Sequence, residues 1–142
     1  MQLLLIHADL LEYWVKAKIK ALEGLPKDAV TPENEHRKFE ECLGVFTSVE
    51  KKDAADPTAV ARAVAGIKEV FEKVNAKEVV LYPYAHLSSE LARPREAMDI
   101  LVAVEEGLKA AGVPVARVPF GSYKQFHLHC KGHPLSELSK KI

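Results

Sequence analysis

Lys124 is the residue of this sequence whose surroundings most call for a chemical explanation. In a strand it shares one face with Phe126 and Leu128, and an ammonium group on an apolar face needs a partner such as a carboxylate, a phosphate or a substrate carbonyl. Glu137 is a candidate partner, because Pro134 is expected to open a last short helix with Glu137 in its first turn. The residues leave an alternative equally open: a lysine that extends to solvent and a glutamate that caps a helix.

Two segments could form a small pocket at strand ends. Residues 82–86 (YPYAH) follow a buried strand, and in α/β sheets ligands bind at the carboxyl ends of strands. Pro83 stiffens this segment and Ala85 leaves room beside the backbone, which suits a site that measures a small substrate. In residues 120–124 (FGSYK), Gly121 permits a similar bend at the start of a strand. A tight turn out of the sheet is the simpler explanation of the first segment.

Histidines provide the densest group of possible metal ligands. In a strand, His127 and His129 share a face while Cys130 points to the other, and His133 could add a third ligand for zinc. A histidine pair on a half-exposed sheet face is the simpler interpretation, because no second His or Cys pair completes a closed site. We therefore predict no metal centre.

Motifs for other kinds of chemistry are missing. The sequence has neither GxGxxG nor GxxxxGK[ST], so no phosphate-binding loop is predicted, and it lacks the GxSxG motif of serine hydrolases. Ser88 lies close to His86 in sequence, but such closeness does not make a triad. The simpler interpretation is that Ser88 caps a turn after the strand.

The hydrophobic pattern predicts one α/β domain over residues 1–142. Strand–helix–strand occurs twice in succession, which favours parallel neighbouring strands covered by helices. Asp56-Pro57 is typical of a helix start, and Gly112 suits a helix C-cap. The expected strands cover residues 2–6, 13–19, 42–49, 78–82, 115–118 and 124–130; Trp14 breaks the alternation of the second, where a helix remains an alternative. The expected helices cover residues 56–74 and 94–111, and residues 21–35, with Pro26 and Pro32, form a loop.

Composition bounds the possible partners. The 142 residues contain 20 basic and 20 acidic side chains, so any RNA binding must come from a local patch or from a larger assembly. Asp9 and Glu12 end the first apolar run early, so we expect neither a signal peptide nor a membrane span. Cys42 and Cys130 lie in apolar, strand-like settings and are expected to be free thiols.

The sequence resembles the amino-terminal editing domain of archaeal-type threonyl-tRNA synthetases. The resemblance is carried by residues 82–91 (YPYAHLSSEL), 119–124 (PFGSYK) and 131–138 (KGHPLSEL), with support from 46–51 (FTSVEK) and 97–101 (AMDIL), and it extends over nearly the whole chain. It implies an α/β fold like that of D-aminoacyl-tRNA deacylases, with a mixed β-sheet and two long covering helices. Domains of this family usually form homodimers. The resemblance also implies hydrolysis of serine mischarged onto threonine-accepting tRNA. Such proofreading is needed because one methyl group discriminates by only about 1–3 kcal/mol in binding.

The same resemblance implies the roles of individual residues. Lys124 and Glu137 match the family's active-site lysine and glutamate. A water held between main-chain amides and the terminal ribose, assisted by the free 2′-hydroxyl, would hydrolyse the ester, while Lys124 positions the ester or offsets oxyanion charge. The matching substrate-binding positions are Val49, Pro83, Ala85 and His86, framed by Phe120 and Tyr123.

Partners and cofactors follow from the resemblance as well. No cofactor is expected in this domain; ATP, magnesium and zinc would belong to the absent aminoacylation domain, which acts in cis for an excised piece of a synthetase or in trans for a stand-alone editing factor. The expected partners are the 3′ end of tRNA(Thr) carrying serine and a second copy of the chain, with no membrane and a cytoplasmic location. His127 and His129 depart from the family pattern, so it gives no support to a metal site.

Two other functions remain as alternatives. One is a D-aminoacyl-tRNA deacylase on the same fold. The other is a non-catalytic tRNA-binding or dimerisation module whose pocket has decayed. The presence of both Lys124 and Glu137 speaks against the second.

Overall fold

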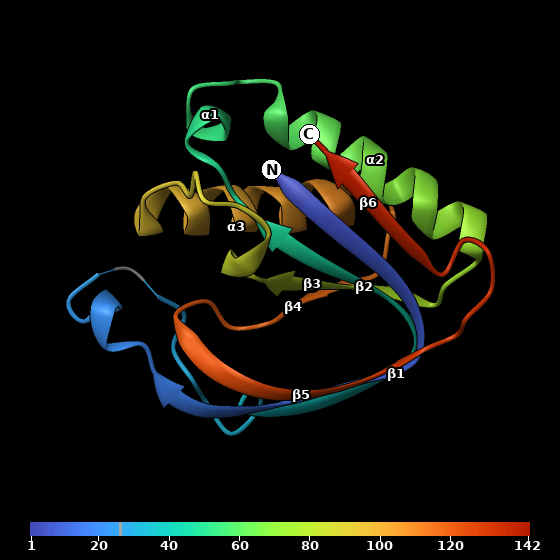
Figure 1. The fold of residues 1–142 in the computed structure, drawn as a ribbon, viewed down its shortest axis with the longest axis horizontal. Coiled ribbons are helices and arrows are strands. Elements are labelled where there is room, and N and C mark those ends of the chain that lie inside the picture. Colours follow the sequence, from blue (N-terminus) through green and yellow to red (C-terminus); the bar gives the residue numbers. More distant parts are fainter. Residues whose placement is uncertain (26) are drawn as a thin grey trace.

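One long, curved strand organises the sheet. The computed structural model describes residues 1–25 and 27–142, and in it β1 (Gln2–Lys18) pairs antiparallel with β2 (His36–Ser48) on one edge. Its other edge pairs with β5 (Ser122–Cys130) along the second half and with β6 (Glu137–Lys141) along the first half. β3 (Glu78–Pro83) and β4 (Val115–Arg117) continue the sheet beyond β2, giving the order β4-β3-β2-β1-β5 (Figure 1).

The predicted parallel neighbours are present. β2, β3 and β4 run parallel, each connected to the next through a helix. α2 (Ala59–Val74) and α3 (Pro94–Ala110) are the two long helices, and both lie on the same face of the sheet (Figure 1). The predicted mixed α/β fold with two covering helices is therefore confirmed.

Two predicted strands proved to be one. β1 has register shifts against β5 between Ala8 and Leu10 and between Val15 and Ala17, and such irregularities mark β-bulges. A bulge inverts which residues face a given side, so the sequence alternation is broken although the strand continues. β2 likewise begins at His36, directly after the predicted loop and six residues before the predicted start of the strand.

The predicted last helix is wrong. Residues 137–141 form the edge strand β6, in which Leu138 turns inward against the helix-side core and its neighbours are exposed. Pro134 does not open a helix; it lies in a turn closed by a 3.0 Å hydrogen bond from the Ser136 amide to the His133 carbonyl. The unpaired edge of the first half of β1 offers hydrogen bonds that a single helical turn could not supply.

Smaller differences concern the helices and the loop. α2 begins at Ala59, because Asp56 accepts hydrogen bonds from the amide and hydroxyl of Thr58 (2.8 and 2.7 Å) and so caps the turn before the helix. A short helix, α1 (Lys51–Ala54), was not predicted. The loop prediction holds apart from η1 (Lys20–Leu22), a single 3₁₀ turn; Pro26 lies outside the described residues.

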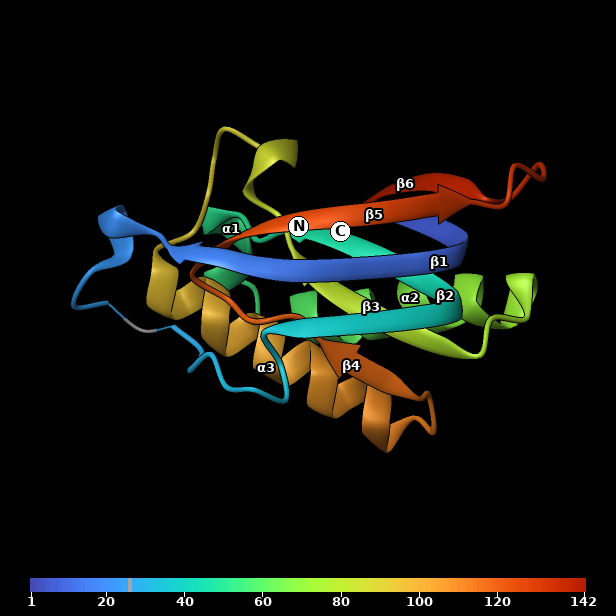
Figure 2. The same cartoon turned by 90° about the horizontal axis from the view of Figure 1, so that it is seen from below.

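Two hydrophobic cores lie on opposite faces of the sheet. The first joins the sheet to α2 and α3, with Leu43 and Leu81 at its centre. The second fills the concave face formed where β1, β2 and β5 curl over β3 and β4, and it is rich in aromatic rings such as Tyr13 and Tyr82 (Figures 1 and 2). Cys42 belongs to this core, and burial raises the pKa of its thiol to about 12. Both cysteines are free thiols, as predicted, with Cys130 partly exposed.

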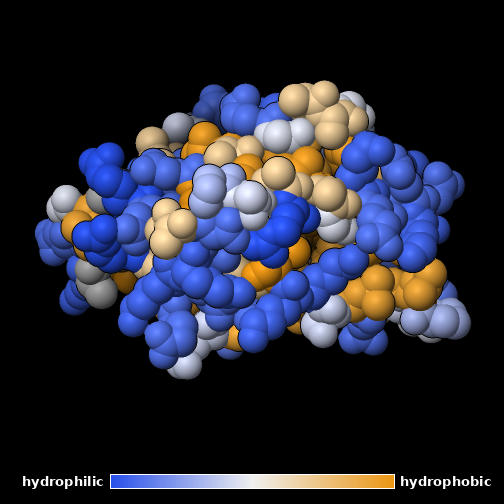
Figure 3. All heavy atoms as spheres, turned by 90° about the horizontal axis from the view of Figure 1, so that it is seen from above, coloured by the Kyte–Doolittle hydropathy of each residue, from blue (hydrophilic) through white to orange (hydrophobic). Residues whose placement is uncertain are grey.

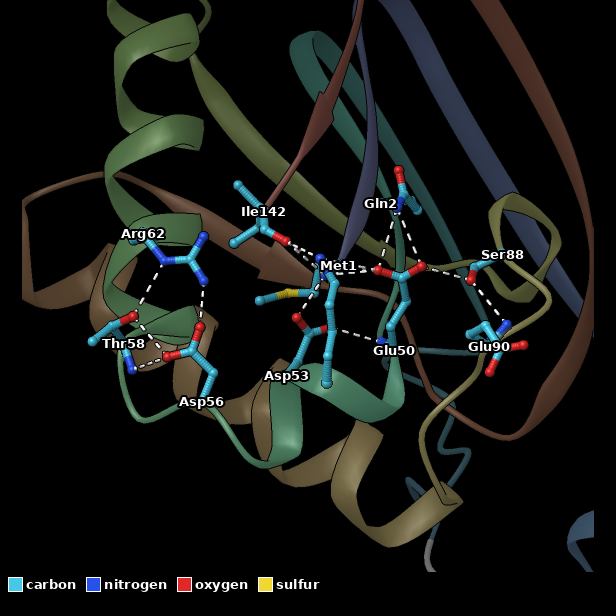
Figure 4. A network of polar contacts seen from close by, with 11 residues as sticks. Met1, Gln2, Glu50, Asp53, Asp56, Thr58, Arg62, Ser88, Glu90 and Ile142 are labelled. Atoms are coloured by element: carbon cyan, nitrogen blue, oxygen red, sulfur yellow. Dashed lines mark hydrogen bonds and ion pairs between the residues drawn. The ribbon is translucent and has the colours of Figure 1, made fainter.

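The amino terminus is tied into the fold by buried charges. The Met1 ammonium donates to the Asp53 carboxylate at 2.7 Å and lies 3.3 Å from the Glu50 carboxylate (Figure 4). Glu50 also accepts hydrogen bonds from Gln2 and Ser88. These contacts clamp the start of β1 to the segment that follows β2.

The helix-bearing side of the molecule is mostly hydrophilic. Viewed from the side of α1 and α2, polar residues cover the surface, with apolar patches between them (Figure 3). Ion pairs such as Lys68–Glu72 and Lys73–Glu69 lie on the outer face of α2. Among the described residues, no helix is long and apolar enough to cross a membrane.

Candidate active site

A cavity of about 530 Å³ opens where β2 and β3 end and β5 begins. It lies at the carboxyl ends of parallel strands, the position at which α/β sheets bind ligands. Residues around η1, η2 (Ala85–Leu87) and the start of β5 line it. In Figure 1, η1 and the start of β5 lie at the left-hand end of the molecule. All predicted site residues except Glu137 line the cavity, namely Val49, Pro83, Ala85, His86, Phe120, Tyr123 and Lys124.

One wall of the cavity is the segment that leaves β3. The Tyr84 amide donates to the Thr47 carbonyl at 2.9 Å, which extends the β2–β3 pairing past Pro83. The Ser48 hydroxyl donates to the Tyr84 carbonyl and accepts from the Leu87 amide at 3.1 Å. Ser48 therefore fixes both ends of the η2 turn, and this wall is held as a rigid main-chain surface.

A second set of contacts holds the rim that follows η2. The Ser88 hydroxyl donates to Glu50 at 2.8 Å and accepts from the Glu90 amide at 3.0 Å, so its predicted role as a turn cap is confirmed. The Ala92 amide donates to the Val49 carbonyl at 3.0 Å. Although burial raises the pKa of Glu50, the hydrogen bonds from Ser88, Gln2 and the Met1 amine outweigh it and lower that pKa to about 2.

The opposite wall depends on an ion-pair network that the sequence did not indicate. Asp28 accepts from the Phe120 amide at 2.8 Å and from the Arg117 guanidinium, whose Nε donates to Glu105 at 2.8 Å. Gly121 has φ +89, and a Cβ there would lie 2.5 Å from the Cβ of Lys27. The loop after β1 thus packs directly against the Phe120–Gly121 bend.

Lys124 reaches into the cavity from β5. As predicted, it shares an inward face with Phe126 and Leu128, which pair with Tyr13 and Leu11 of β1. Its Nζ donates to the Ser122 carbonyl at 2.7 Å and lies 5.6 Å from the centre of the Tyr82 ring. Burial lowers the pKa of Lys124 to about 8, partly offset by the charge of Asp28. This ammonium is poorly solvated, so it can interact strongly with a bound oxyanion.

The predicted contact between Lys124 and Glu137 does not occur within the chain. Glu137 is the first residue of β6 and pairs with Ile6, whereas Lys124 pairs with Val15. Ile6 and Val15 are nine positions apart along β1, which at about 3.3 Å per residue is roughly 30 Å of strand. β5 therefore begins at one end of the molecule and β6 at the other (Figure 1).

The three histidines of the carboxyl-terminal segment are not brought together. His127 and His129 are exposed on the outward face of β5, opposite Glu12 and Leu10 of β1. His133 instead contacts His7, with 2.7 Å between His7 Nδ1 and His133 Nε2. In residues 1–25 and 27–142, no three His, Cys, Asp or Glu side chains are arranged to hold a metal ion.

Several residues of the cavity were missed by sequence reasoning. Thr47 and Ser48 lie at the end of a buried strand, and this position could have identified them from the sequence as cavity residues. The Ser122 hydroxyl is buried in the cavity wall and has no hydrogen-bond partner in the described part of the chain. Asp28 and Arg117 lie far apart in sequence, and only the fold brings them together.

The fold belongs to a known class. It matches the solved structure of the c-Myc DNA Unwinding Element Binding Protein with a TM-score of 0.69 and 11% sequence identity, over 100% of this chain and 99% of that one. This likeness shows the fold alone: a mixed β-sheet with two long helices on one face.

The sequence comparisons define the family within that class. The model of the archaea-specific editing domain of threonyl-tRNA synthetase matches residues 1–142, and the chain belongs to this family. The threonine–tRNA ligases of Thermococcus gammatolerans and Methanoregula boonei are 50% and 49% identical to it over 143 residues. The match covers 100% of this chain but only 22% of either ligase.

Proposed function

We propose that this domain hydrolyses the ester of L-serine mischarged on tRNA(Thr). The observation that carries the proposal is the cavity itself: main-chain walls at strand ends surround a half-buried, poorly solvated lysine in a chain of the editing-domain family. Its volume lies in the range of sites for small organic ligands. An aminoacyl ester is already activated, so positioning and charge stabilisation suffice without a protein nucleophile.

In the proposed reaction, water attacks the ester carbonyl and the bond to the ribose oxygen breaks. The tetrahedral intermediate carries negative charge on the former carbonyl oxygen, and the Lys124 ammonium stabilises it. The rigid wall of residues 83–87 orients the serine, with Val49 and His86 beside it. The free 2′-hydroxyl of the terminal adenosine orients the attacking water. Freed serine and tRNA with an intact 3′ end are the products.

Glu137 can contribute to this site only from another molecule. Its position at the far end of β1 excludes contact with the Lys124 of its own chain. In the homodimer that the family resemblance implies, a second copy would supply this carboxylate to hold the substrate amine or the lysine. We further propose that the domain works with an aminoacylation domain, in cis or in trans, in the cytoplasm, and that it needs no cofactor of its own.

Release of labelled serine from Ser-tRNA(Thr) tests the proposal. Lys124→Met should reduce the single-turnover rate by about 10²–10³, the usual loss when one oxyanion-stabilising group is removed. A 2′-deoxy terminal ribose should slow the wild-type protein by orders of magnitude. An unchanged rate in either case would remove that group from the mechanism. Faster release of a D-amino acid than of L-serine would instead favour a D-aminoacyl-tRNA deacylase.

A further inference from the structure

Three lysines gather where β1 ends beside the cavity. Lys16 and Lys18 are exposed at the end of β1, and Lys20 is the first residue of η1. Lys18 pairs in the sheet with Ser122 of the cavity wall. Figure 2 shows the end of β1 and η1 lying at the same end of the molecule as the start of β5. We call the group formed by Lys16, Lys18 and Lys20 the lysine edge.

The lysine edge is a local positive patch. Within residues 1–25 and 27–142, none of its three ammonium groups forms an ion pair. Among the acidic residues of the neighbouring segments, Asp28 binds Arg117, and Glu12 lies 2.7 Å from His36 Nε2. Glu23 after η1 and Glu35 beside Val15 are exposed. Because the whole chain balances 20 basic against 20 acidic side chains, this patch is a feature of the fold and not of the composition.

Aromatic rings accompany the lysines. Tyr123 lines the cavity mouth and is 60% exposed, although tyrosine usually buries most of its ring. Trp14 is half-buried and lies two positions further along the β1–β5 pairing, opposite Gln125, with its ring stacked on His36 at 5.1 Å between centroids. Lysines beside an exposed aromatic ring such as Tyr123 are the combination with which proteins bind single-stranded nucleic acid, since lysines contact phosphates and rings stack on bases.

We propose that the lysine edge, with Tyr123 and Trp14, binds the unpaired 3′ end of the tRNA as it enters the cavity. This inference rests on the proposed function, because the terminal nucleotide must reach the cavity for its ester to be hydrolysed. When the terminal aminoacyl-adenosine is inside the cavity, the phosphates of the preceding nucleotides run across the cavity mouth, next to the lysine edge. Phosphate contacts position the RNA and carry no sequence information, so the surface accepts any unpaired 3′ end.

Binding of an uncharged RNA hairpin with an unpaired 3′ end tests this surface without any catalysis. Fluorescence anisotropy would give the Kd between 50 and 200 mM salt for the wild type and for Lys16→Gln/Lys18→Gln/Lys20→Gln. Loss of three phosphate contacts should make the slope of log affinity against log salt shallower by about 2. The ratio of the variant Kd to the wild-type Kd should therefore fall roughly 15- to 20-fold between 50 and 200 mM salt. Lys68→Gln/Lys73→Gln/Lys140→Gln changes the net charge equally on the α2 side and should leave the slope unchanged.

Three results would overturn the proposal. The first is an unchanged Kd and salt slope in the lysine-edge variant. The second is equal binding of a blunt hairpin that lacks the unpaired end. The third is a change of sedimentation mass without a change of RNA affinity, which would make the face an interface between copies of this chain.

Hydrolysis of seryl-adenosine separates this proposal from the proposed function. The lysine-edge variant should hydrolyse this minimal ester like the wild type but show a raised KM for Ser-tRNA(Thr). Equal losses on both substrates would mean that the lysines act on the cavity and not on the RNA. A wild type that binds the hairpin but hydrolyses neither ester would defeat the proposed function and leave the RNA surface standing.

Discussion

Replacing Lys124 by methionine should stabilise the folded protein at neutral pH while removing the proposed activity. Burial lowers the pKa of this lysine from its ordinary 10.5 to about 8, so the fold disfavours the charged form. Methionine keeps the length and most of the volume of the side chain, so the surrounding contacts with Phe126 and Tyr82 should persist. The variant therefore isolates the energetic consequence of the ammonium group.

The magnitude follows from the lowered pKa. One pH unit of difference between the folded and unfolded pKa corresponds to about 1.4 kcal/mol, so a charged Lys124 destabilises the fold by up to about 3 kcal/mol. The hydrogen bond from Nζ to the Ser122 carbonyl, 2.7 Å long, returns about 1 kcal/mol. A net gain of ~1–2 kcal/mol is expected for Lys124→Met below pH 8.

Urea unfolding of both proteins between pH 7 and pH 10.5 would measure this difference. The destabilisation is fully present below the folded pKa of about 8 and disappears as the pH rises toward 10.5, where the unfolded lysine also loses its proton. The two free energies of unfolding should therefore converge. Lys109→Met, at an exposed position, should differ from the wild type by less than about 0.5 kcal/mol throughout. A Lys124→Met protein that is less stable at pH 7, or a difference independent of pH, would show that the Lys124 ammonium does not destabilise the fold.

Three further predictions concern other contacts of the fold and site. Glu50→Gln should lower the free energy of unfolding by about 2–3 kcal/mol at pH 7. This difference should vanish as the pH falls from 4.5 toward the folded pKa of about 2. Urea unfolding would measure it, and a loss that persists at pH 2 would contradict the prediction. Gly121→Ala should lower the free energy of unfolding by more than Gly112→Ala. Both glycines have positive φ, but only the Cβ added at Gly121 lies 2.5 Å from the facing loop. Equal losses of about 1 kcal/mol by calorimetry would show that backbone strain from the positive φ is the sole cause. Mixing inactive Lys124→Met with inactive Glu137→Gln should restore about a quarter of the wild-type deacylation rate if a second chain supplies Glu137, because half the dimers then hold one intact site; no recovery would exclude that arrangement.

The sequence predicted the parallel part of the fold well, for a physical reason. α2 and α3 carry apolar residues at helical spacing, and buried strands such as β3 are short and uniformly apolar. β1 was divided in error because its bulges invert the alternation on which strand prediction depends. β6 was mistaken for a helix because Pro134 and Glu137 suit a helix start, whereas the pairing of residues 137–141 with the first half of β1 is a contact between distant segments.

The site shows the same division between local and non-local signals. Pro83, Ala85, His86, Tyr123 and Lys124 were found because they follow strand ends within recognisable segments. The partner of Lys124 was predicted wrongly, since the distance between two segments depends on which part of β1 each one joins. The Asp28–Arg117 pair could not be predicted at all, because its function comes from contacts between a loop and a distant strand.

Selective removal of serine, and not threonine, from tRNA(Thr) is the activity that we propose for this chain. Single-turnover deacylation of Ser-tRNA(Thr) and Thr-tRNA(Thr) by the chain alone, under identical conditions, tests it most directly. We predict that serine is released at least 100-fold faster than threonine, because a site that fits the smaller side chain can exclude the larger one by size. Equal rates for the two esters, or no release of serine above the spontaneous rate, would contradict the account.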